Sequence, residues 1–595
     1  RVGGRPMSEG SVRRGGRAST PPPLARASAG GALGGRPGGR PTQPVVAADR
    51  ASSSMPPDGE AAAEAVVPPL ASVDALGVFT GLWAQVLVLQ VVKLTIKARS
   101  AGANQPAAIA WLALMASAVA FGVLLPERGE ATVFLNAAGL LVLSCTGSQS
   151  NHVILEMVVC VAILVTYSAN RKRWLAQATH AVRLFVVVLY WVTGLHKLNS
   201  DWDNNALSCC NHMIGGLLAL PPLNFNSMLD NLPIGLFPYF TAVTELTLPI
   251  LLLRSGKSLR YATVVAALFH LPIGMMLPPM SVYPFSLLMA PLYVFVIPSQ
   301  ASAVFGRVKG WVACLVVAVA CQKWTALMAP ELEAGTEPFE YPPYGCWAAG
   351  VVWCIGVYSM LVFAAVSDKN GKEVCSSTPT WRGRFVALFV LVFGLSPYLG
   401  IRNYPALAMF SNLRTEGGRS NHAFLGDDFD FIGWQRDYVT VHETNIRALE
   451  LAQVDLAPLY TRKTKKTLNF IYAERQFWLT PPLEAWPYNY TRPMSMWKPY
   501  SMPFLELRRR LAPLRAAGSE GTVLYTRTLA RAKLRYPGLW QRLGKENLEA
   551  DKVTPDITYD LSVGGDAELE EPLPWWLAVV ARWRTFDVEY SPCRH

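Results

Sequence analysis

The chain has 595 residues, of which 51% are hydrophobic and only 16% are charged, whereas soluble domains carry about 25% charged residues. The mean hydropathy is +0.24, and long apolar runs recur through residues 75–403. The net charge of +12 does not indicate nucleic-acid binding, because nine arginines and only two acids occupy residues 1–50 and most other basic residues lie in short loops. The composition therefore excludes an ordinary soluble protein and argues against a nucleic-acid partner.

Residues 1–72 form the first segment of the chain. They are rich in Gly, Pro, Ala, Ser and Arg and show no apolar periodicity. Such a segment buries too little surface to offset its chain entropy, so we expect a disordered basic tail. An Arg- and Ser-rich, acid-poor segment also fits an organelle transit peptide. We expect the first apolar run, near residue 76, to serve as signal and anchor together.

Residues 73–404 contain the apolar runs. A bilayer core of ~30 Å needs ~20 apolar helical residues. This segment therefore predicts an all-α polytopic membrane domain of about eleven transmembrane helices. The expected spans are 76–96, 107–125, 131–147, 152–168, 178–198, 236–253, 259–277, 282–298, 309–327, 345–366 and 385–402.

The charges of the loops predict the orientation of these spans. Loops on the side of the N-terminus carry thirteen basic residues, whereas the opposite loops carry only Lys97 and Arg99. Because basic loops stay cytoplasmic, we expect a cytoplasmic N-terminus and a lumenal or extracellular C-terminus. The endoplasmic reticulum or another endomembrane is the expected location, with an organelle membrane as the alternative. The one sequon considered, residues 489–491, lies on the expected lumenal side.

Residues 405–595 change character and predict an extramembrane domain that is mainly β or mixed α/β. Strands are expected at 438–441, 467–472, 523–526 and 557–559, and a helix at 504–516. The run at 575–584 is too short to span a bilayer. Its tryptophans predict an amphipathic helix at the membrane surface.

Several kinds of chemistry have no sequence signal. The ten cysteines include no CxxC pair, so no metal site is expected. Cys209 and Cys210 share a long loop, and Cys346 lies near the same membrane face, so either a disulfide or free thiols fit there. P-loop, GxGxxG, HExxH and GxSxG motifs do not occur. Nucleotide hydrolysis and hydride transfer therefore have no support.

The most informative segment is GLHKLNSDW, in which Lys197 follows His196 at the end of a predicted span. Lys197 lies on the face that otherwise lacks positive charge. A desolvated lysine can act as a neutral amine base. The alternatives are that Lys197 snorkels to the interface or pairs with Asp201.

Other polar residues lie at membrane depth. They are Asn151 and His152 at the start of one span, Glu245 in another, and His270 in a third. A buried carboxylate there predicts a function and a partner, such as Lys197 or a histidine. The alternative is a structural hydrogen bond between helices. The polar segment 410–422 predicts either an anion site or a structural turn with a local ion pair.

These motifs resemble those of the HTTM (horizontally transferred transmembrane) family, which includes the vitamin K-dependent gamma-glutamyl carboxylase. The resemblance covers roughly residues 75–425. It rests on Gly194, Lys197, Leu198 and Trp202, on Asn151-His152, Glu245, Pro249 and Phe269-His270, and on the segment SNLRTEGGRSNH.

The resemblance implies a carboxylase chemistry. A lysine amine would deprotonate vitamin K hydroquinone, and with O2 and CO2 the enzyme would carboxylate glutamate in a protein substrate. Lys197 matches that lysine, and His196 stands where the family enzyme has a second lysine. Asn151, His152, Glu245 and His270 are the expected cofactor-binding residues.

Two features depart from the family pattern. The carboxylase has an asparagine–histidine pair near the end of the helix before the lysine helix, whereas Arg171 follows Asn170 here. The C-terminal domain is also shorter than the substrate-binding region of the carboxylase. Two alternatives to a carboxylase-like enzyme therefore stay open. One is a non-enzymatic lipid- or quinone-binding or assembly protein, and the other is a transporter.

Overall fold

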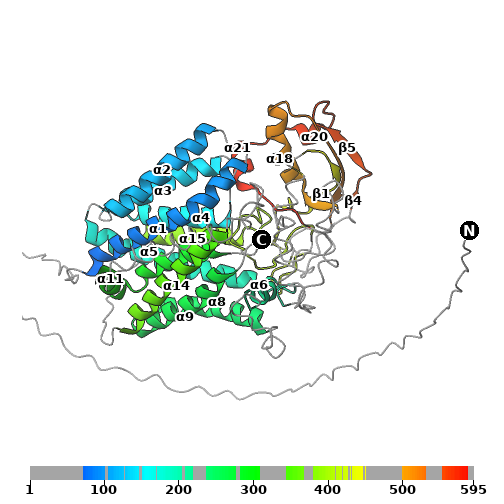
Figure 1. The fold of residues 1–595 in the computed structure, drawn as a ribbon. Coiled ribbons are helices and arrows are strands. Elements are labelled where there is room, and N and C mark those ends of the chain that lie inside the picture. The colour runs from blue at the N-terminus through cyan, green and yellow to red at the C-terminus, as the bar shows by residue number, and fades with distance from the viewer. Residues whose placement is uncertain are drawn as a thin grey trace, which may run out of the picture. The chain divides into compact units, whose positions relative to one another are not determined.

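A computed structural model describes residues 71–586 with internal gaps, the longest at 219–235, 308–343, 368–379, 450–498 and 531–551. Helices make up most of the described residues, and a small sheet follows them (Figure 1). Four sequence predictions fall outside the described residues: the tail over residues 1–70, the span at 309–327, the strand at 467–472 and the sequon at 489–491.

Every predicted span outside 309–327 coincides with a helix. The helices are α1 (Ala71–Ser100), α2 (Gln105–Leu124), α3 (Gly129–Cys145), α4 (Asn151–Val165), α5 (Arg171–His196), α6 (Cys209–Leu218), α8 (Phe237–Leu253), α9 (Lys257–Met275), α10 (Tyr283–Leu292) with the 3₁₀ turn η3 (Tyr293–Phe295), α11 (Pro298–Arg307), α14 (Tyr344–Ser367) and α15 (Trp381–Leu395). The helical character of residues 73–404 is therefore confirmed for the described part of this segment.

Eleven transmembrane helices are not supported. Three described helices are long and apolar enough to cross a bilayer, at Lys172–His196, Lys257–Met275 and Trp347–Ser367. A fourth crossing results if Tyr283–Phe295 and Pro298–Phe305, which meet at 108°, form one broken span. In five other helices the described apolar part has only 10–17 residues, and 17 helical residues extend only ~25 Å. The sequence prediction counted each apolar run as one span, including the run at 282–298, which is broken between two helices.

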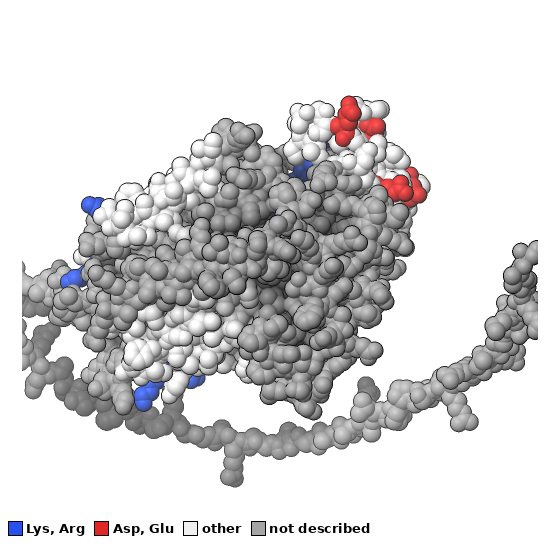
Figure 2. Space-filling model, viewed as in Figure 1, with Lys and Arg blue, Asp and Glu red and all other residues white. Residues whose placement is uncertain are grey.

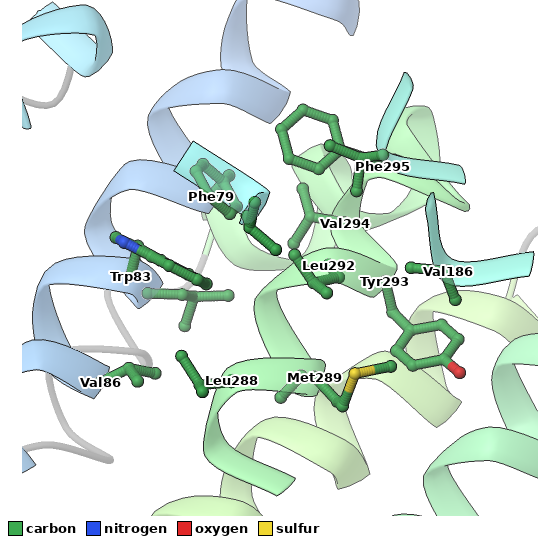
Figure 3. Packing of buried hydrophobic residues seen from close by; sticks show 14 of the residues in the cluster. Phe79, Trp83, Val86, Val186, Leu288, Met289, Leu292, Tyr293, Val294 and Phe295 are labelled. Carbon is green, nitrogen blue, oxygen red and sulfur yellow. The ribbon is translucent and has the colours of Figure 1, made fainter. Parts of the chain in front are cut away.

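The core of the helical part surrounds α10. All ten residues of α10 are buried, which is expected of a helix that is apolar on every side. Figure 3 shows side chains of α10 and η3 packed against Phe79 and Trp83 of α1 and against Val186 of α5. The rings of Phe79 and Phe295 lie 4.8 Å apart between centroids. This packing joins helices that are far apart in the sequence.

The outer helices expose apolar side chains. On α8, Phe240 and Val243 are 68% and 61% exposed, and on α15 Phe385 and Leu388 are 63% and 57% exposed. In Figure 2 the described helix surface is nearly free of charge, and the visible Lys and Arg side chains lie at its margins. Surfaces of this extent are unusual in water-soluble monomers. They are compatible with a membrane protein.

The C-terminal part contains a five-stranded antiparallel sheet, with strand order β2-β1-β3-β4 and β5 paired with β3. The strands are β1 (Asp437–Thr444), β2 (Tyr500–Pro503), β3 (Thr522–Leu529), β4 (Lys552–Val553) and β5 (Ile557–Asp560). Helix α18 (Phe504–Ala516) packs its buried residues Phe504, Leu507 and Leu511 into the same core. The short helices α20 (Ala567–Glu570) and α21 (Trp575–Val580) follow. The predicted helix and the described predicted strands are confirmed.

Candidate functional site

The C-terminal end of α5 is the centre of the candidate site. The last carbonyl groups of a helix lack partners within the helix, and other parts of the chain supply them here. His422 Nε2 lies 3.0 Å from the Leu195 carbonyl oxygen, and Asn199 Nδ2 donates to the His196 carbonyl at 2.8 Å. His422 Nδ1 accepts from the amide of Leu425, so Nε2 is the nitrogen that carries the proton. These hydrogen bonds fix the backbone at the end of α5, from which the Lys197 side chain extends.

Lys197 directly follows α5 and points back into the helical bundle. Its Nζ lies 2.7 Å from Glu245 Oε2 on α8, and each side chain is only 6% exposed. The same nitrogen lies 3.4 Å from the Thr193 carbonyl oxygen and 5.3 Å from the ring centroid of Trp202. Glu245 also contacts the Thr193 hydroxyl. The structure thus joins two of the residues that the sequence analysis selected.

The sequence around these two residues explains how α5 and α8 come so close. A methyl group on Gly194 would lie 3.0 Å from Leu246 and 3.2 Å from Cβ of Glu245. Only glycine leaves the room that α8 occupies. Pro249 lies four residues after Glu245 inside α8 and has no N–H to donate to the Glu245 carbonyl. The Gly194 and Pro249 positions therefore shape the contact that brings the two side chains together.

Neither alternative for Lys197 holds in the structure. The residue is 7% exposed, so it does not snorkel to a surface. Asp201 pairs instead with Arg414, with 2.9 Å between Oδ2 and Nε. The ion pair of Lys197 therefore lies inside the bundle, where little solvent reaches it.

A buried lysine–carboxylate pair is a costly feature. Desolvation of both groups offsets most of their attraction, whereas removal of one partner leaves a charge buried alone and costs about 3–5 kcal/mol. The pair can be written as ammonium and carboxylate or as amine and carboxylic acid, with one proton between Nζ and Oε2. A group of this kind is able to accept or release a proton inside an apolar bundle.

His196 does not share this pair. Its Nε2 lies 2.8 Å from the Gly394 carbonyl oxygen on α15, and its ring lies 5.5 Å from that of Tyr398. Residues 196 and 197 are adjacent in sequence and therefore leave the helix in different directions. The predicted catalytic pair of Lys197 and His196 faces two different helices.

His270 belongs to a second polar group beside the pair. Its Nε2 lies 2.5 Å from the Tyr190 hydroxyl, and that hydroxyl lies 2.5 Å from the Tyr293 hydroxyl. The ring of His270 also stacks on Tyr358, with 6.0 Å between centroids. Tyr190 and Thr193 are one turn apart on α5, so this group adjoins the Lys197–Glu245 pair.

Asn151 has a structural role in the backbone that follows α15. Its Oδ1 accepts hydrogen bonds from the amides of Ala406 and Leu407 at 3.1 and 3.0 Å. His152 is buried beside it. Because α4 and α5 are antiparallel neighbours, this Asn-His pair opens α4 at the end where Lys197 closes α5. The family pattern has such a pair near the position of Asn170, at the opposite end of these helices.

Lys197, His270 and Asn151 therefore gather at one end of the bundle without meeting in a common pocket. Each contacts different neighbours. This separation weakens the expectation that all three line one cofactor site.

The segment 410–422 acts as a structural turn in its described residues. Arg414 is paired with Asp201. Glu416 accepts from Arg584 at 3.3 Å and from Asn403. Both charges are thus neutralised within the protein. The anion site considered from the sequence gains no support from them.

Sequence reasoning missed two residues that complete the site. Tyr190 and Thr193 precede Lys197 by seven and four residues, which places all three on one face of α5. That spacing is the signal that could have found them. The structure also shows that Cys209 is disulfide-bonded, whereas the adjacent Cys210 is a free, buried thiol.

The residues at the site fit part of a quinol-binding role. An apolar quinol needs a dry position beside a base and an aromatic or aliphatic surface. Lys197 is buried and faces Trp202, which supplies the base and the aromatic surface. A substrate hydroxyl would approach the Lys197–Glu245 pair rather than a lone amine. Among the described residues, no group of three or more His, Cys, Asp or Glu side chains could hold a metal ion.

Fold and site together define a helical protein with an apolar exterior and a buried Lys–Glu pair at one end of its bundle. Comparisons with protein-family models, with curated proteins and with solved structures find no match for this chain. The argument for its function therefore rests on the residues themselves.

Proposed function

We propose that the chain is a multi-pass membrane protein of HTTM type, in which Lys197 and Glu245 form a proton-transfer centre for a quinol-like substrate. The carboxylation of peptide glutamate driven by vitamin K hydroquinone is the concrete form of this proposal. The observation that carries it is the buried contact of 2.7 Å between Nζ and Oε2. A lysine at a helix end that reached the membrane surface would have no need of a carboxylate at that depth.

The two side chains have complementary tasks in this reaction. When Glu245 holds the proton of the pair, the Lys197 amine accepts a second proton from the substrate hydroxyl. When Lys197 holds it, the carboxylate is the acceptor. Both routes end with an ammonium and a carboxylic acid, and the ammonium stabilises the negative charge left on the substrate oxygen. The bound hydroquinone, with O2, would supply the strong base that removes the glutamate γ-proton before CO2 adds.

The same proposal includes an orientation. The disulfide at Cys209 indicates an oxidising compartment, and Cys209 lies close to the end of α5 because its amide donates to Asn412. The basic loops lie at the opposite ends of the helices, as cytoplasmic loops would. The end of the bundle that holds Lys197, together with the C-terminal domain, then faces the lumen of the endoplasmic reticulum or a related membrane. A glutamate-containing protein would meet the site from that side.

Incorporation of labelled CO2 into a glutamate peptide tests this function. The protein is reconstituted in vesicles with vitamin K hydroquinone and O2. Wild type is compared with Lys197→Ala, with Glu245→Gln, and with His442→Ala as a control in the sheet domain. Incorporation by wild type and the control but not by the two site variants supports the proposal. No incorporation by any of the four removes the carboxylase reaction.

A second function, transport, is favoured by one observation. The hydroxyls of Tyr190 and Tyr293 and the ring of His270 form a path of polar groups, and Tyr190 lies one turn before Thr193, which contacts Glu245. A transporter would use this path for a proton or solute. Uptake into vesicles that depends on Glu245, without CO2 incorporation, would establish that function. A protein that binds a quinone in vesicles, but neither takes up solute nor incorporates CO2, would be a binding or assembly protein.

A further inference from the structure

Helix α4 carries a second buried acid, Glu156, which the sequence analysis did not single out. Glu156 is 0% exposed, and neither of its oxygens has a hydrogen-bond partner among the described residues. It forms no ion pair with any described Lys, Arg or His, in contrast to Glu245. An ionised carboxylate buried without a cation is far more costly than a neutral carboxylic acid. The burial therefore favours the protonated form.

The neighbours of Glu156 are arranged to accept a proton donor. Asn136 on α3 interacts with it, and Asn136 Nδ2 donates to Cys160 Sγ at 3.3 Å. Asn136 Oδ1 is also buried and without a partner. A protonated carboxyl has one O–H to donate. Donated to Asn136 Oδ1, that proton gives this buried acceptor a partner, whereas a carboxylate has no proton to offer it.

Most charged groups on the surrounding helices lie at helix ends, whereas His180 and Arg183 lie near the middle of α5. Helices α3, α5, α10 and α15 pack against α4, and α10 has no charged residue. The titratable group that interacts with Glu156 is the Cys160 thiol on α4 itself. Charged or titratable residues on the other three helices are Glu130, Cys145, Arg171, Lys172, Arg173, His180, Arg183, Tyr190, His196, Arg382 and Arg384. Of these, Arg183 donates to backbone carbonyls at the end of α8.

The sequence of α4 provides a route for the proton. His152, Glu156 and Cys160 recur every four residues, so they share one face of the helix. Glu156 lies ~6 Å along the axis from His152. His152 lies in the first turn of α4, at the end of the bundle that holds Lys197. It is the titratable side chain of α4 between Glu156 and that end.

We propose that Glu156, with Asn136, is a proton-binding site between α3 and α4 that exchanges its proton through His152. In the exchange the carboxyl O–H bond breaks and an imidazole N–H bond forms, which leaves a carboxylate and an imidazolium. The reverse step restores the neutral acid. The site is separate from the Lys197–Glu245 pair, and it does not depend on the reaction proposed for that pair.

Reaction with dicyclohexylcarbodiimide, an apolar reagent that modifies protonated carboxyl groups, tests the first part. The full chain in lipid vesicles is treated at neutral pH, and the adducts are located by mass spectrometry. We expect an adduct on Glu156 in wild type and its loss in Glu156→Gln. Glu245 is expected to react only after Lys197→Ala, which provides a positive control for access of the reagent. Reaction of Glu245 in that variant without reaction of Glu156 would overturn the proposal.

Infrared spectroscopy tests the same site without a reagent. The carbonyl stretch of a protonated carboxyl group should disappear in Glu156→Gln, and its absence from wild type would overturn the proposal. The route is tested by transfer into D2O, which shifts that band. We expect the shift to be several-fold slower in His152→Phe than in wild type. An unchanged rate would remove His152 from the route.

Discussion

The Nζ atom of Lys197 lies 2.7 Å from Oε2 of Glu245, although the two residues are 48 positions apart. The contact depends on the approach of α8 to Gly194 of α5. A base at the end of α5 and an acid within α8 thus form one unit that holds a single proton in a nearly dry environment. The predictions that follow test the parts of this unit and the domain attached to it.

Single substitutions of the pair should be more destabilising than its complete removal. Lys197→Met or Glu245→Leu alone leaves a buried charge, and we expect a loss of about 3–5 kcal/mol in the free energy of unfolding. The double variant replaces the pair by apolar groups of similar size and should lie close to wild type. Thermal unfolding of the four proteins in one detergent measures this. Additive losses in the double variant would show that the two side chains do not interact.

Gly194 should tolerate no side chain in the wild-type background. Gly194→Ala places a methyl group 3.0 Å from Leu246, and overpacking of this kind costs about 1–3 kcal/mol. Leu246→Ala in the same chain removes the obstructing atoms, so the double variant should lose less stability than the two single losses combined. Thermal unfolding of wild type, the two single variants and the double variant measures the coupling energy between positions 194 and 246. If the losses add, α5 and α8 are not packed as closely as described.

The C-terminal domain should show an acid-sensitive stability that comes from Glu506. Burial raises the pKa of this carboxyl, but Arg509 and Arg510 lower it more, and the result is a pKa of about 2 against an ordinary 4.5. The ionised carboxylate therefore stabilises the fold fully at pH values above the ordinary pKa of 4.5. This stability is lost as the pH falls from 4.5 towards 2. Unfolding of the full chain is followed across that range.

Glu506→Gln should flatten that pH dependence, because the substituted side chain cannot take up a proton. Glu520→Gln, at an exposed position of the same domain, is the matched control and should keep the slope of wild type. Identical slopes for Glu506→Gln and wild type would assign the acid sensitivity to another group.

Helix α21 should lie at the membrane surface. Trp575 and Trp576 are 80% and 50% exposed, and the carbonyl of Arg582, just beyond the helix, accepts from the Asn403 amide at 3.1 Å. Asn403 follows α15, so the tryptophans are tied to the end of the helical bundle, where aromatic residues meet headgroups. A nitroxide label at position 576 should show the oxygen accessibility of a lipid environment. A label at Val563, which is 81% exposed, should report water, and equal values at both positions would refute the assignment.

Helix positions were readable from the sequence because each apolar run is long compared with a turn. Breaks within an apolar run were not, because hydropathy does not register where backbone hydrogen bonding stops. The run at 282–298 illustrates this, since it breaks after η3 and turns through 108° before α11. The helix at 504–516 was predicted correctly, because turn residues lie at both of its ends.

The site was only partly predictable for a related reason. Lys197 and Glu245 stood out as charges in apolar runs, but their contact depends on the absence of a side chain at Gly194. Asn151 was selected as a ligand-binding residue, and the structure shows that its side chain caps the backbone at Ala406 and Leu407. Long-range capping of this kind has no local sequence pattern. Glu156 was overlooked because one acid in an apolar run does not reveal whether a cation lies opposite it.

Chemical rescue of Lys197→Ala is the most direct test of the central claim that the Lys197 amine accepts the substrate proton. The variant, shown to be folded by its thermal unfolding, is assayed for CO2 incorporation with small primary amines added at constant pH. Recovery of activity that rises with the basicity of the amine is the predicted result. If wild type is active and the folded variant gains no activity from any amine, Lys197 is not the base and the account fails.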